Sequence, residues 1–201
     1  MSRSWGRYYD ATGDLPRETL LFALERFEAV GASSEEGLFA IDLGCGAGRD
    51  TAELLRRGWR VLAVDAEEEA IERLLQRDDL RPEDVGRLET QVARFEDAKL
   101  PRANLVNSSF ALPFCPPTQF EAVWHMIVAA LEGGGRLSGQ LFGDRDSWAT
   151  TPEMSFQTRE AAEELLRGLD VERFTEVEED GETALGEAKH WHVFHVVARK
   201  R

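Results

Sequence analysis

The segment that most constrains the fold is AIDLGCGAGRD, at residues 40–50. It begins inside a short, almost entirely apolar run and ends where a helix is expected over residues 49–57. Gly44, Gly46 and Gly48 therefore lie on a tight turn between a buried strand and a helix. Such a turn needs residues that tolerate positive φ, and the missing side chains let a ligand contact the backbone. The segment predicts a ligand-binding turn at the carboxyl end of a strand.

Helix-like and strand-like segments alternate along the rest of the chain. Strands are expected at residues 38–43, 60–65, 88–95, 103–110, 170–179 and 189–199, and GGGRLSGQLFG at residues 133–143 is expected to be a turn followed by a further strand. Helices are expected at residues 17–30, 49–57, 67–77, 118–131 and 158–168. Buried strands that alternate with helices predict an α/β fold, in which a mostly parallel sheet carries helices on both faces. The two closing strands have no helix between them, which predicts a hairpin and hence one antiparallel strand.

Length and charge narrow the class of protein. The length of 201 residues suits a single domain over residues 1–201. Asp and Glu outnumber Lys and Arg by 38 to 24, and the net charge of −14 would repel nucleic acid and anionic membranes. No apolar run approaches the roughly 20 residues of a membrane helix, and no secretory signal is visible. Cys45 and Cys115 form no disulfide framework, which suits a reducing cytoplasm. Together with the charge, this predicts a cytoplasmic protein with no nucleic-acid or membrane partner.

An acidic residue completes the pattern of the glycine turn. Asp65 ends the next expected strand, 21 positions after Gly44, where its carboxylate can accept hydrogen bonds from both hydroxyls of a ribose. The glycine spacing is G-x-G-x-G, whereas the dinucleotide fingerprint is G-x-G-x-x-G. Asp42 would repel a pyrophosphate but suits a positively charged amino-acid group, so the pattern favours S-adenosylmethionine as the cofactor. A plain tight turn beside a surface carboxylate is the structural alternative.

At these residues the chain resembles a known family. AIDLGCGAGRD followed by VLAVDA resembles motif I and its acidic follower in class I S-adenosylmethionine-dependent methyltransferases. The resemblance covers nearly the whole chain and implies a Rossmann-like, doubly wound sheet of seven strands in the order 3-2-1-4-5-7-6, the last strand antiparallel. The short length and the segment NLVNSSFALPFC further resemble the small stand-alone enzymes related to tellurite-resistance methyltransferases.

The resemblance also implies a set of cofactor contacts. These are Asp42, Gly44, Cys45 and Gly46 for the methionine end, Gly48 to close the turn, Asp65 for the ribose, Ala66 and Asp97 (or its neighbour Glu96) for the adenine, and Asn107 and Ser108 beside the methyl group. Many relatives carry an acid near the position of Asn107, so this sequence departs from the family there. That departure leaves no fixed catalytic carboxylate.

The aromatic segment WGRYYDATGD, at residues 5–14, precedes the first long helix. In relatives, tyrosines at this place fold over the cofactor, so residues 1–16 are a candidate lid and Tyr9 a candidate cofactor contact. A ring face beside a sulfonium is a favourable cation–π contact. Arg17 is a candidate partner for the carboxylate of the cofactor, because a guanidinium binds that group in a bidentate way. The alternative is that these aromatic residues cover apolar surface.

The methyl acceptor is expected at the edge of the sheet where the parallel strands end. Besides the cofactor loops, three segments reach this edge, namely SSFALPF, GDRDSW and KHWH. The acceptor-pocket candidates are Asp144, Arg145, Asp146, Trp148, His190 and Trp191. No residue stands out as a general base, and Asn107, His190 and Asp144 are weak catalytic candidates. His125 is expected to be a packed or surface residue of a helix.

We expect no metal site. His190 and His192 would share one face of a strand while His195 points to the other face, so two imidazoles lack the further ligands that zinc needs. The sequence therefore predicts a methyltransferase that moves a methyl group from S-adenosylmethionine to a small-molecule acceptor, such as a thiol or a metalloid oxyanion, by in-line displacement. The alternatives are a nicotinamide-dependent oxidoreductase and a cofactor-binding protein of the same fold without catalysis. No oligomeric state is predicted.

Overall fold

The computed structural model describes residues 5–32 and 37–201, so residues 1–4 of the expected lid lie outside the described part of the chain. It contains one eight-stranded sheet in the order β3-β2-β1-β4-β5-β8-β7, with β6 paired to β5 off this path. The strands are β1 (Phe39–Leu43), β2 (Arg60–Asp65), β3 (Leu88–Val92), β4 (Ala103–Ser108), β5 (Leu131–Gly143), β6 (Phe156–Gln157), β7 (Leu169–Glu182) and β8 (Ala188–Lys200). Strands β1 to β5 are parallel, and β8 runs antiparallel to both β5 and β7.

The predicted topology is confirmed, with one addition. The expected order 3-2-1-4-5-7-6 is the observed order once the two-residue strand β6 is counted, because β6 shifts the numbers of the last two strands. The antiparallel strand is β8, the last in the chain, as expected. The α/β class with a mostly parallel sheet is therefore the fold of this protein.

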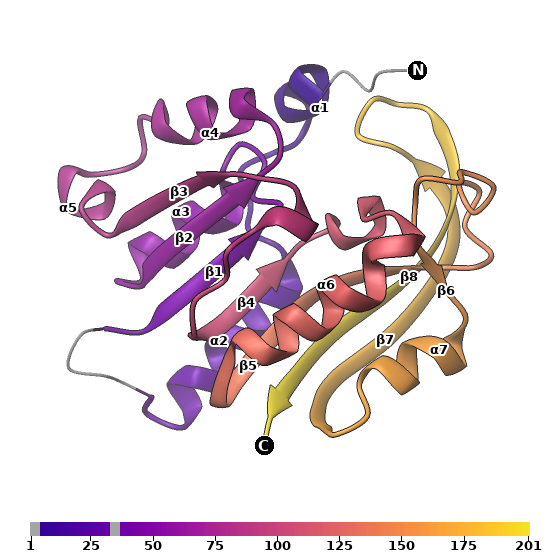
Figure 1. Cartoon of the computed structure of the whole chain (residues 1–201). Coiled ribbons are helices and arrows are strands. Elements are labelled where there is room, and N and C mark those ends of the chain that lie inside the picture. Colours follow the sequence, from indigo (N-terminus) through magenta and orange to yellow (C-terminus); the bar gives the residue numbers. More distant parts are fainter. Residues whose placement is uncertain (1–4, 33–36) are drawn as a thin grey trace.

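The helices are α1 (Trp5–Ala11), α2 (Glu18–Ala29), α3 (Arg49–Arg56), α4 (Glu68–Leu75), α5 (Pro82–Val85), α6 (Pro117–Ala130) and α7 (Arg159–Leu165), with 3₁₀ turns η1 (Phe95–Asp97) and η2 (Leu112–Phe114). Helices lie on both faces of the sheet (Figure 1). The short elements α1, α5, β6, η1 and η2 were not expected from periodicity, since two to seven residues are too few to show it. Within the described residues, no helix is long and apolar enough to cross a membrane.

The two faces of the sheet bury separate hydrophobic clusters, because successive side chains of a strand point to opposite faces. Ile41 of β1 belongs to the larger cluster, which includes Phe120 and Ile127 of α6. Its neighbour Ala40 belongs to a second cluster with Leu24 of α2 and Leu54 of α3. This alternation explains why β1 is apolar at nearly every position. Because β1 is buried on both faces, the glycine turn that follows it is held at the carboxyl end of the strand.

Three strand limits differ from expectation. β3 ends at Val92, before the η1 turn, and β4 ends at Ser108 because Phe110 takes a left-handed conformation with φ 54°. The three-glycine segment that was expected to be a turn belongs to β5, where the pairing with β4 is irregular. A non-glycine residue at positive φ is strained, so the path of the chain at Phe110 is held in place by its surroundings.

The carboxyl ends of the parallel strands meet at one edge of the sheet. Helix α1 and the turn between β7 and β8 lie on this same side of the molecule, at the top of Figure 1. This edge is where the sequence places the ligand-binding turn.

Candidate cofactor and acceptor site

The glycine turn is fastened to the neighbouring strand. The backbone N–H groups of Gly44 and Cys45 both donate to the carbonyl of Val64 on β2, at 2.7 and 3.0 Å. Gly44 has φ 78°, and a Cβ there would overlap the methyl group of Ala111. Gly48 is the N-cap of α3 in a left-handed conformation, where a Cβ would overlap Leu74. These two positions require glycine on steric grounds as well as conformational ones.

Asp65 holds the middle of the turn. One carboxylate oxygen accepts the N–H of Gly46 at 2.8 Å, and the other accepts the N–H of Glu67 at 3.0 Å. Burial raises the pKa of the Asp65 carboxyl above its usual range, although these backbone donors act in the opposite direction. Each carboxylate oxygen has a second lone pair for a further donor.

A cavity of about 450 Å³ opens beside the turn. On the β2–β3 side it is lined by Asp65, Ala66, Glu67, Ala93, Arg94, Phe95 and Glu96. On the β4 side it is lined by Ser109, Phe110, Ala111, Phe114, Pro116 and Glu153. Gly44 and Gly46 lie between these sets, and Trp5, Tyr8 and Tyr9 of α1 complete the lining. A volume of this size suits a small-molecule ligand.

The cavity distinguishes the two acids that were candidates for the adenine end. Glu96 lines the cavity, whereas Asp97 is exposed and does not line it. Both lie in η1, one residue apart, and a 3₁₀ turn directs neighbouring side chains in different directions. The geometry favours Glu96, the residue that the resemblance gave as the alternative.

Asp42 and Asn107 lie beneath the turn and not in the lining of the cavity. The Asn107 amide donates to Asp42 at 2.9 Å and to Asp50 at 3.1 Å, and its oxygen accepts from the Ser138 hydroxyl at 2.7 Å. Thr51 also donates to Asp42, at 2.6 Å. Burial, together with the neighbouring Asp50, raises the pKa of Asp42 to about 7. This buried polar network joins β1, β4, β5 and α3 directly below the glycine turn.

Ser108 and Cys45 are also buried away from the cavity lining. The Ser108 hydroxyl donates to the carbonyl of Leu43, and the Cys45 thiol contacts the carbonyl of Gly46. Burial raises the pKa of the Cys45 thiol, which keeps it protonated. Both side chains therefore support the turn in this structure, and their expected contacts with a cofactor stay a prediction.

Helix α1 covers the cavity with aromatic side chains. The ring of Trp5 meets that of Phe114 edge to face, with centroids 5.1 Å apart. Tyr9 is buried against Gly46, and a Cβ at that glycine would lie 3.3 Å from the Tyr9 ring. Burial and the nearby Asp65 raise the pKa of Tyr9. The aromatic segment thus lies where a lid would lie, and its movement stays a prediction.

Arg17 lies next to the same wall. Its guanidinium is 4.5 Å from the centroid of the Phe110 ring, and its backbone N–H donates to Asp50 at 3.0 Å. The Nε of Arg17 is buried and has no hydrogen-bond partner among the described residues. Burial, reinforced by the neighbouring Arg49, lowers the pKa of Arg17. A buried guanidinium N–H without an acceptor suits the carboxylate of a ligand.

The six acceptor-pocket candidates lie behind this cavity and do not line it. Asp146 forms a fully buried ion pair with Lys189, whose Nζ lies 3.8 Å from the ring centroid of Trp148 and 4.5 Å from that of Trp191. Phe114 touches Trp148, and Phe110 touches Trp191, with ring centroids 6.5 and 6.3 Å apart. The caged lysine therefore supports the back of the aromatic wall.

The remaining candidates take part in surface ion pairs. Arg145 pairs with Glu176 and Glu178, and Asp144 is half exposed. His190 binds Asp180 at 2.7 Å, an arrangement that raises the pKa of His190. His125 is exposed on α6, as expected. Asn107, His190 and Asp144 do not line the cavity, so their catalytic roles find no support in its geometry.

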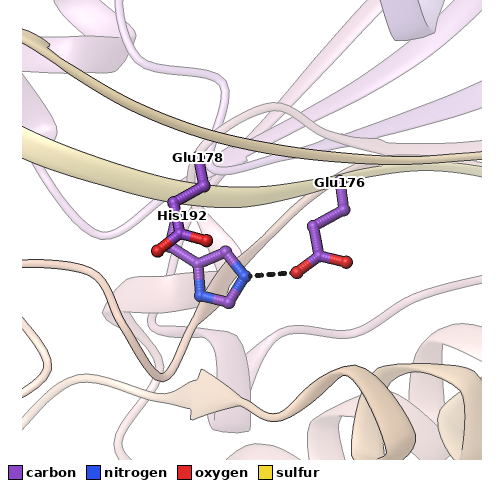
Figure 2. Close-up of side chains that lie close together, drawn as sticks. All are labelled: Glu176, Glu178 and His192. Atoms are coloured by element: carbon purple, nitrogen blue, oxygen red, sulfur yellow. Dashed lines mark hydrogen bonds and ion pairs between the residues drawn. The ribbon is translucent and has the colours of Figure 1, made fainter.

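Among the described residues, one cluster has side chains of the types that bind metal ions. It consists of Glu176, Glu178 and His192, whose ligand atoms lie within 4.8 Å of one another. Figure 2 shows these side chains converging from β7 and β8, with His192 Nε2 bonded to Glu176 at 2.9 Å. The Nη2 of Arg145 lies 2.7 Å from Glu176, 2.8 Å from Glu178 and 3.0 Å from His192. The guanidinium already supplies the positive charge, so the cluster is explained without a metal.

In the segment SSFALPF, sequence reasoning named Ser108 but none of the residues that line the cavity, and it missed Glu153. Phe110 and Phe114 belong to that segment and form much of the aromatic wall. Glu153 reaches the cavity because the next residue but one, Ser155, donates to the carbonyls of Pro113 and Cys115. Nothing in the local sequence signals such a long-range contact.

The comparisons with known proteins agree with this geometry. Residues 40–135, just under half of the chain, match the family model for a methyltransferase domain. No curated protein matches the sequence. The fold is that of the class I S-adenosylmethionine-dependent methyltransferases, and the family match covers the part of it that carries the glycine turn.

Within this class, the fold is similar to TehB from Haemophilus influenzae, with a TM-score of 0.71 and 14% identity over 90% of this chain. The chain spans 62% of the length of that TehB chain. It is also similar to the N-methyltransferase NodS from Bradyrhizobium japonicum, with a TM-score of 0.68 and 19% identity, covering 98% of this chain and 96% of NodS. A third neighbour is the 1,6-didemethyltoxoflavin-N1-methyltransferase of Burkholderia thailandensis, with a TM-score of 0.62, 22% identity, and coverage of 92% and 77%.

The cavity fits S-adenosylmethionine, the cofactor of this class. It offers carboxylate acceptors at the β2–β3 side, bare backbone at Gly44 and Gly46, and aromatic rings from α1. The lining thus offers the partners that a nucleoside and a sulfonium need. The buried Nε of Arg17, a donor that lacks an acceptor among the described residues, lies behind Phe110 and outside the cavity lining.

Proposed function

We propose that this protein transfers the methyl group of S-adenosylmethionine to a small-molecule acceptor. The observation that carries the proposal is the cavity that runs from the glycine turn to an aromatic wall and is covered by α1. Such a cavity suits a small acceptor better than a nucleic acid or a protein surface, and the net charge of −14 disfavours nucleic acid further.

Each end of the cavity has a separate part in the proposal. Asp65 accepts hydrogen bonds from the ribose hydroxyls, and Glu96 accepts the adenine amino group, with Ala66 beside the ring. Gly44 and Gly46 allow close approach of the methionine portion. Arg17 binds its carboxylate. Asp42 and Asn107 act from below, because their hydrogen bonds fix the strands that carry the turn.

The chemistry asks the chain mainly for positioning. The bound cofactor supplies a methyl group on a sulfonium, which already has a good leaving group. The chain must hold the acceptor in line with that group and exclude water, and such positioning is worth about 7–11 kcal/mol in well-oriented reactions. Trp5, Tyr8 and Tyr9 of α1 are the proposed lid that provides the exclusion. A general base is required where the acceptor arrives protonated, and Glu153 is the carboxylate on the β4 side of the cavity.

The neighbours support a small acceptor. The Burkholderia enzyme was solved with 1,6-didemethyltoxoflavin and S-adenosylhomocysteine bound, and NodS is named an N-methyltransferase. Identities of 22% and 19% carry the fold and not the substrate, so the acceptor of this chain is a proposal.

Calorimetric titration with S-adenosylmethionine and with S-adenosylhomocysteine tests the proposal. We expect micromolar binding of both, followed by release of S-adenosylhomocysteine when an acceptor panel of thiols, amines and metalloid oxyanions is supplied. No heat with either compound, together with fluorescence quenching by NADH, would overturn the proposal in favour of a nicotinamide enzyme. Cofactor binding without product from any acceptor would favour the binding-protein alternative.

A further inference from the structure

The β4 side of the cavity, which is the half that remains for the acceptor and is called the acceptor half below, has a distinctive charge pattern. Two groups of charged side chains line the cavity as a whole, namely the acids Asp65, Glu67, Glu96 and Glu153, and the base Arg94. Arg94 lies on the β2–β3 side, because the next residue before it, Ala93, donates its N–H to the carbonyl of Asp65 at 2.8 Å. Among the described lining residues, Glu153 is thus the charged side chain on the β4 side. It is exposed and forms no ion pair with the described residues.

The wall on the same side of the cavity as this carboxylate is aromatic. Trp5 and Phe114 meet edge to face, and Phe110 extends the wall with a backbone held at φ 54°. The N–H of Phe110 donates to the side chain of Gln140 at 2.9 Å, which keeps the ring in place. Aromatic faces bind flat rings by stacking and bind cations through their quadrupole.

Two cations lie behind the wall, and neither is available to an anionic acceptor. Lys189 is fully buried and already paired with Asp146. Arg17 stacks on Phe110 without lining the cavity, and the proposed function assigns it to the carboxylate of the cofactor. The acceptor half therefore combines aromatic faces with a negative carboxylate.

We infer that the acceptor is an amine joined to an aromatic ring through a short alkyl chain, and that anionic acceptors such as metalloid oxyanions and carboxylates are excluded. This inference rests on the proposed function and narrows it. The ring stacks against Trp5 and Phe114, and Glu153 attracts the amino group.

The reaction balances without a further reactant. An ammonium first loses a proton, which Glu153 passes to water, so that the nitrogen lone pair is free. The nitrogen then forms a bond to the methyl carbon while the carbon–sulfur bond breaks and its electron pair stays on sulfur. The products are the N-methylammonium ion, S-adenosylhomocysteine and the one proton released to solvent in the first step.

Three probes of matched shape test the inference, namely phenethylamine, 2-phenylethanol and 3-phenylpropionate. Each is titrated by calorimetry into the protein saturated with S-adenosylhomocysteine. We expect phenethylamine to bind at least about tenfold more tightly than 3-phenylpropionate at low salt, since the two differ by two charges near Glu153, and the ratio to shrink as salt is added. The alcohol should fall between them.

Two pairs of variants locate the effect. Glu153→Arg should lower the preference for the amine at least about fivefold, and Glu153→Gln should lower it less. Glu25→Arg and Glu25→Gln are the matched controls, because Glu25 is exposed on α2 and lies outside the cavity lining, and they should leave the preference unchanged.

The outcomes separate this inference from the proposed function. Failure of S-adenosylhomocysteine to bind would overturn the proposed function itself. If S-adenosylhomocysteine binds, then equal or tighter binding of 3-phenylpropionate, binding of none of the probes, or a preference that Glu153→Arg does not change would each overturn the inference alone.

Discussion

The carboxylate of Asp65 accepts the backbone N–H of Gly46 at 2.8 Å, so the acid that ends β2 holds the turn that follows β1. Because β1 and β2 are neighbouring parallel strands, this hydrogen bond helps to keep the middle of the turn at the carboxyl edge of the sheet. The same carboxylate lines the cavity. Asp65 therefore has a structural part and a proposed binding part, and a substitution changes both.

Asp65→Ala should weaken binding of S-adenosylmethionine by on the order of 1–3 kcal/mol, because it removes acceptors for the ribose and releases the Gly46 N–H. Isothermal titration measures this change. Asp97→Ala is the control, because Asp97 is also an acid that follows a strand of the sheet, but it lies outside the cavity lining. Wild-type affinity in Asp65→Ala would contradict the ribose assignment.

Glu96→Gln and Asp97→Asn separate two neighbouring acids. Glu96→Gln should raise the Kd for S-adenosylmethionine about three- to tenfold, because an amide accepts the adenine amino group less well than a carboxylate does. Asp97→Asn should leave the Kd unchanged, since Asp97 is exposed away from the cavity. The reverse ranking of the two variants would return the adenine contact to Asp97.

Gly44→Ala should abolish tight cofactor binding and lower the melting temperature. The new Cβ would overlap Ala111 at a position with φ 78°. Gly58→Ala is a matched control, because Gly58 has φ 84° but no heavy atom within 4 Å of the added Cβ. Both variants carry the backbone cost of roughly 1 kcal/mol, and the excess loss in Gly44→Ala measures the steric overlap. Equal melting temperatures would show that the turn can move away from Ala111.

Asp42 should make the stability of the protein depend on pH between about pH 4 and pH 7. Its folded pKa is raised from 3.8 to about 7, so the folded state binds more protons than the unfolded state in this window. The stabilising contribution of the protonated carboxyl is complete below the unfolded pKa and is lost as the pH rises through 7, by on the order of 4 kcal/mol. Urea unfolding at a series of pH values measures the slope. Asp42→Asn should flatten it, and an unchanged slope would assign the protonation to another group.

Lys189→Met should destabilise the protein by about 3–5 kcal/mol, because it leaves the buried carboxylate of Asp146 without its cation. The double variant Lys189→Met with Asp146→Asn should recover part of this loss, since an amide is less costly to bury than a carboxylate. Denaturant midpoints give both values. Because Lys189 contacts the rings of Trp148 and Trp191, the single variant should also change the wavelength of maximum tryptophan fluorescence. Equal loss in the single and double variants would show that the charge of Asp146 is not the cause.

The sequence by itself determined the order of the sheet and the glycine turn. Alternating apolar strands and helices leave few ways to cover both faces of a parallel sheet, and the turn at residues 40–50 requires glycine at fixed positions. Asp65 follows from the same logic, since parallel strands end at one edge. These features depend on residues close together in the chain or on the periodicity of single elements.

The tertiary structure decided which polar residues reach the cavity. Asp42 and Asn107 have the expected residue types, yet they bind each other beneath the turn because β1 and β4 are adjacent and place them in register. Glu96 lines the cavity and Asp97 does not, a distinction made by the direction of one turn. Phe110, Phe114 and Glu153 come together through contacts between η2 and the segment before β6. Such contacts depend on side chains that are far apart in the sequence, so no local pattern predicts them.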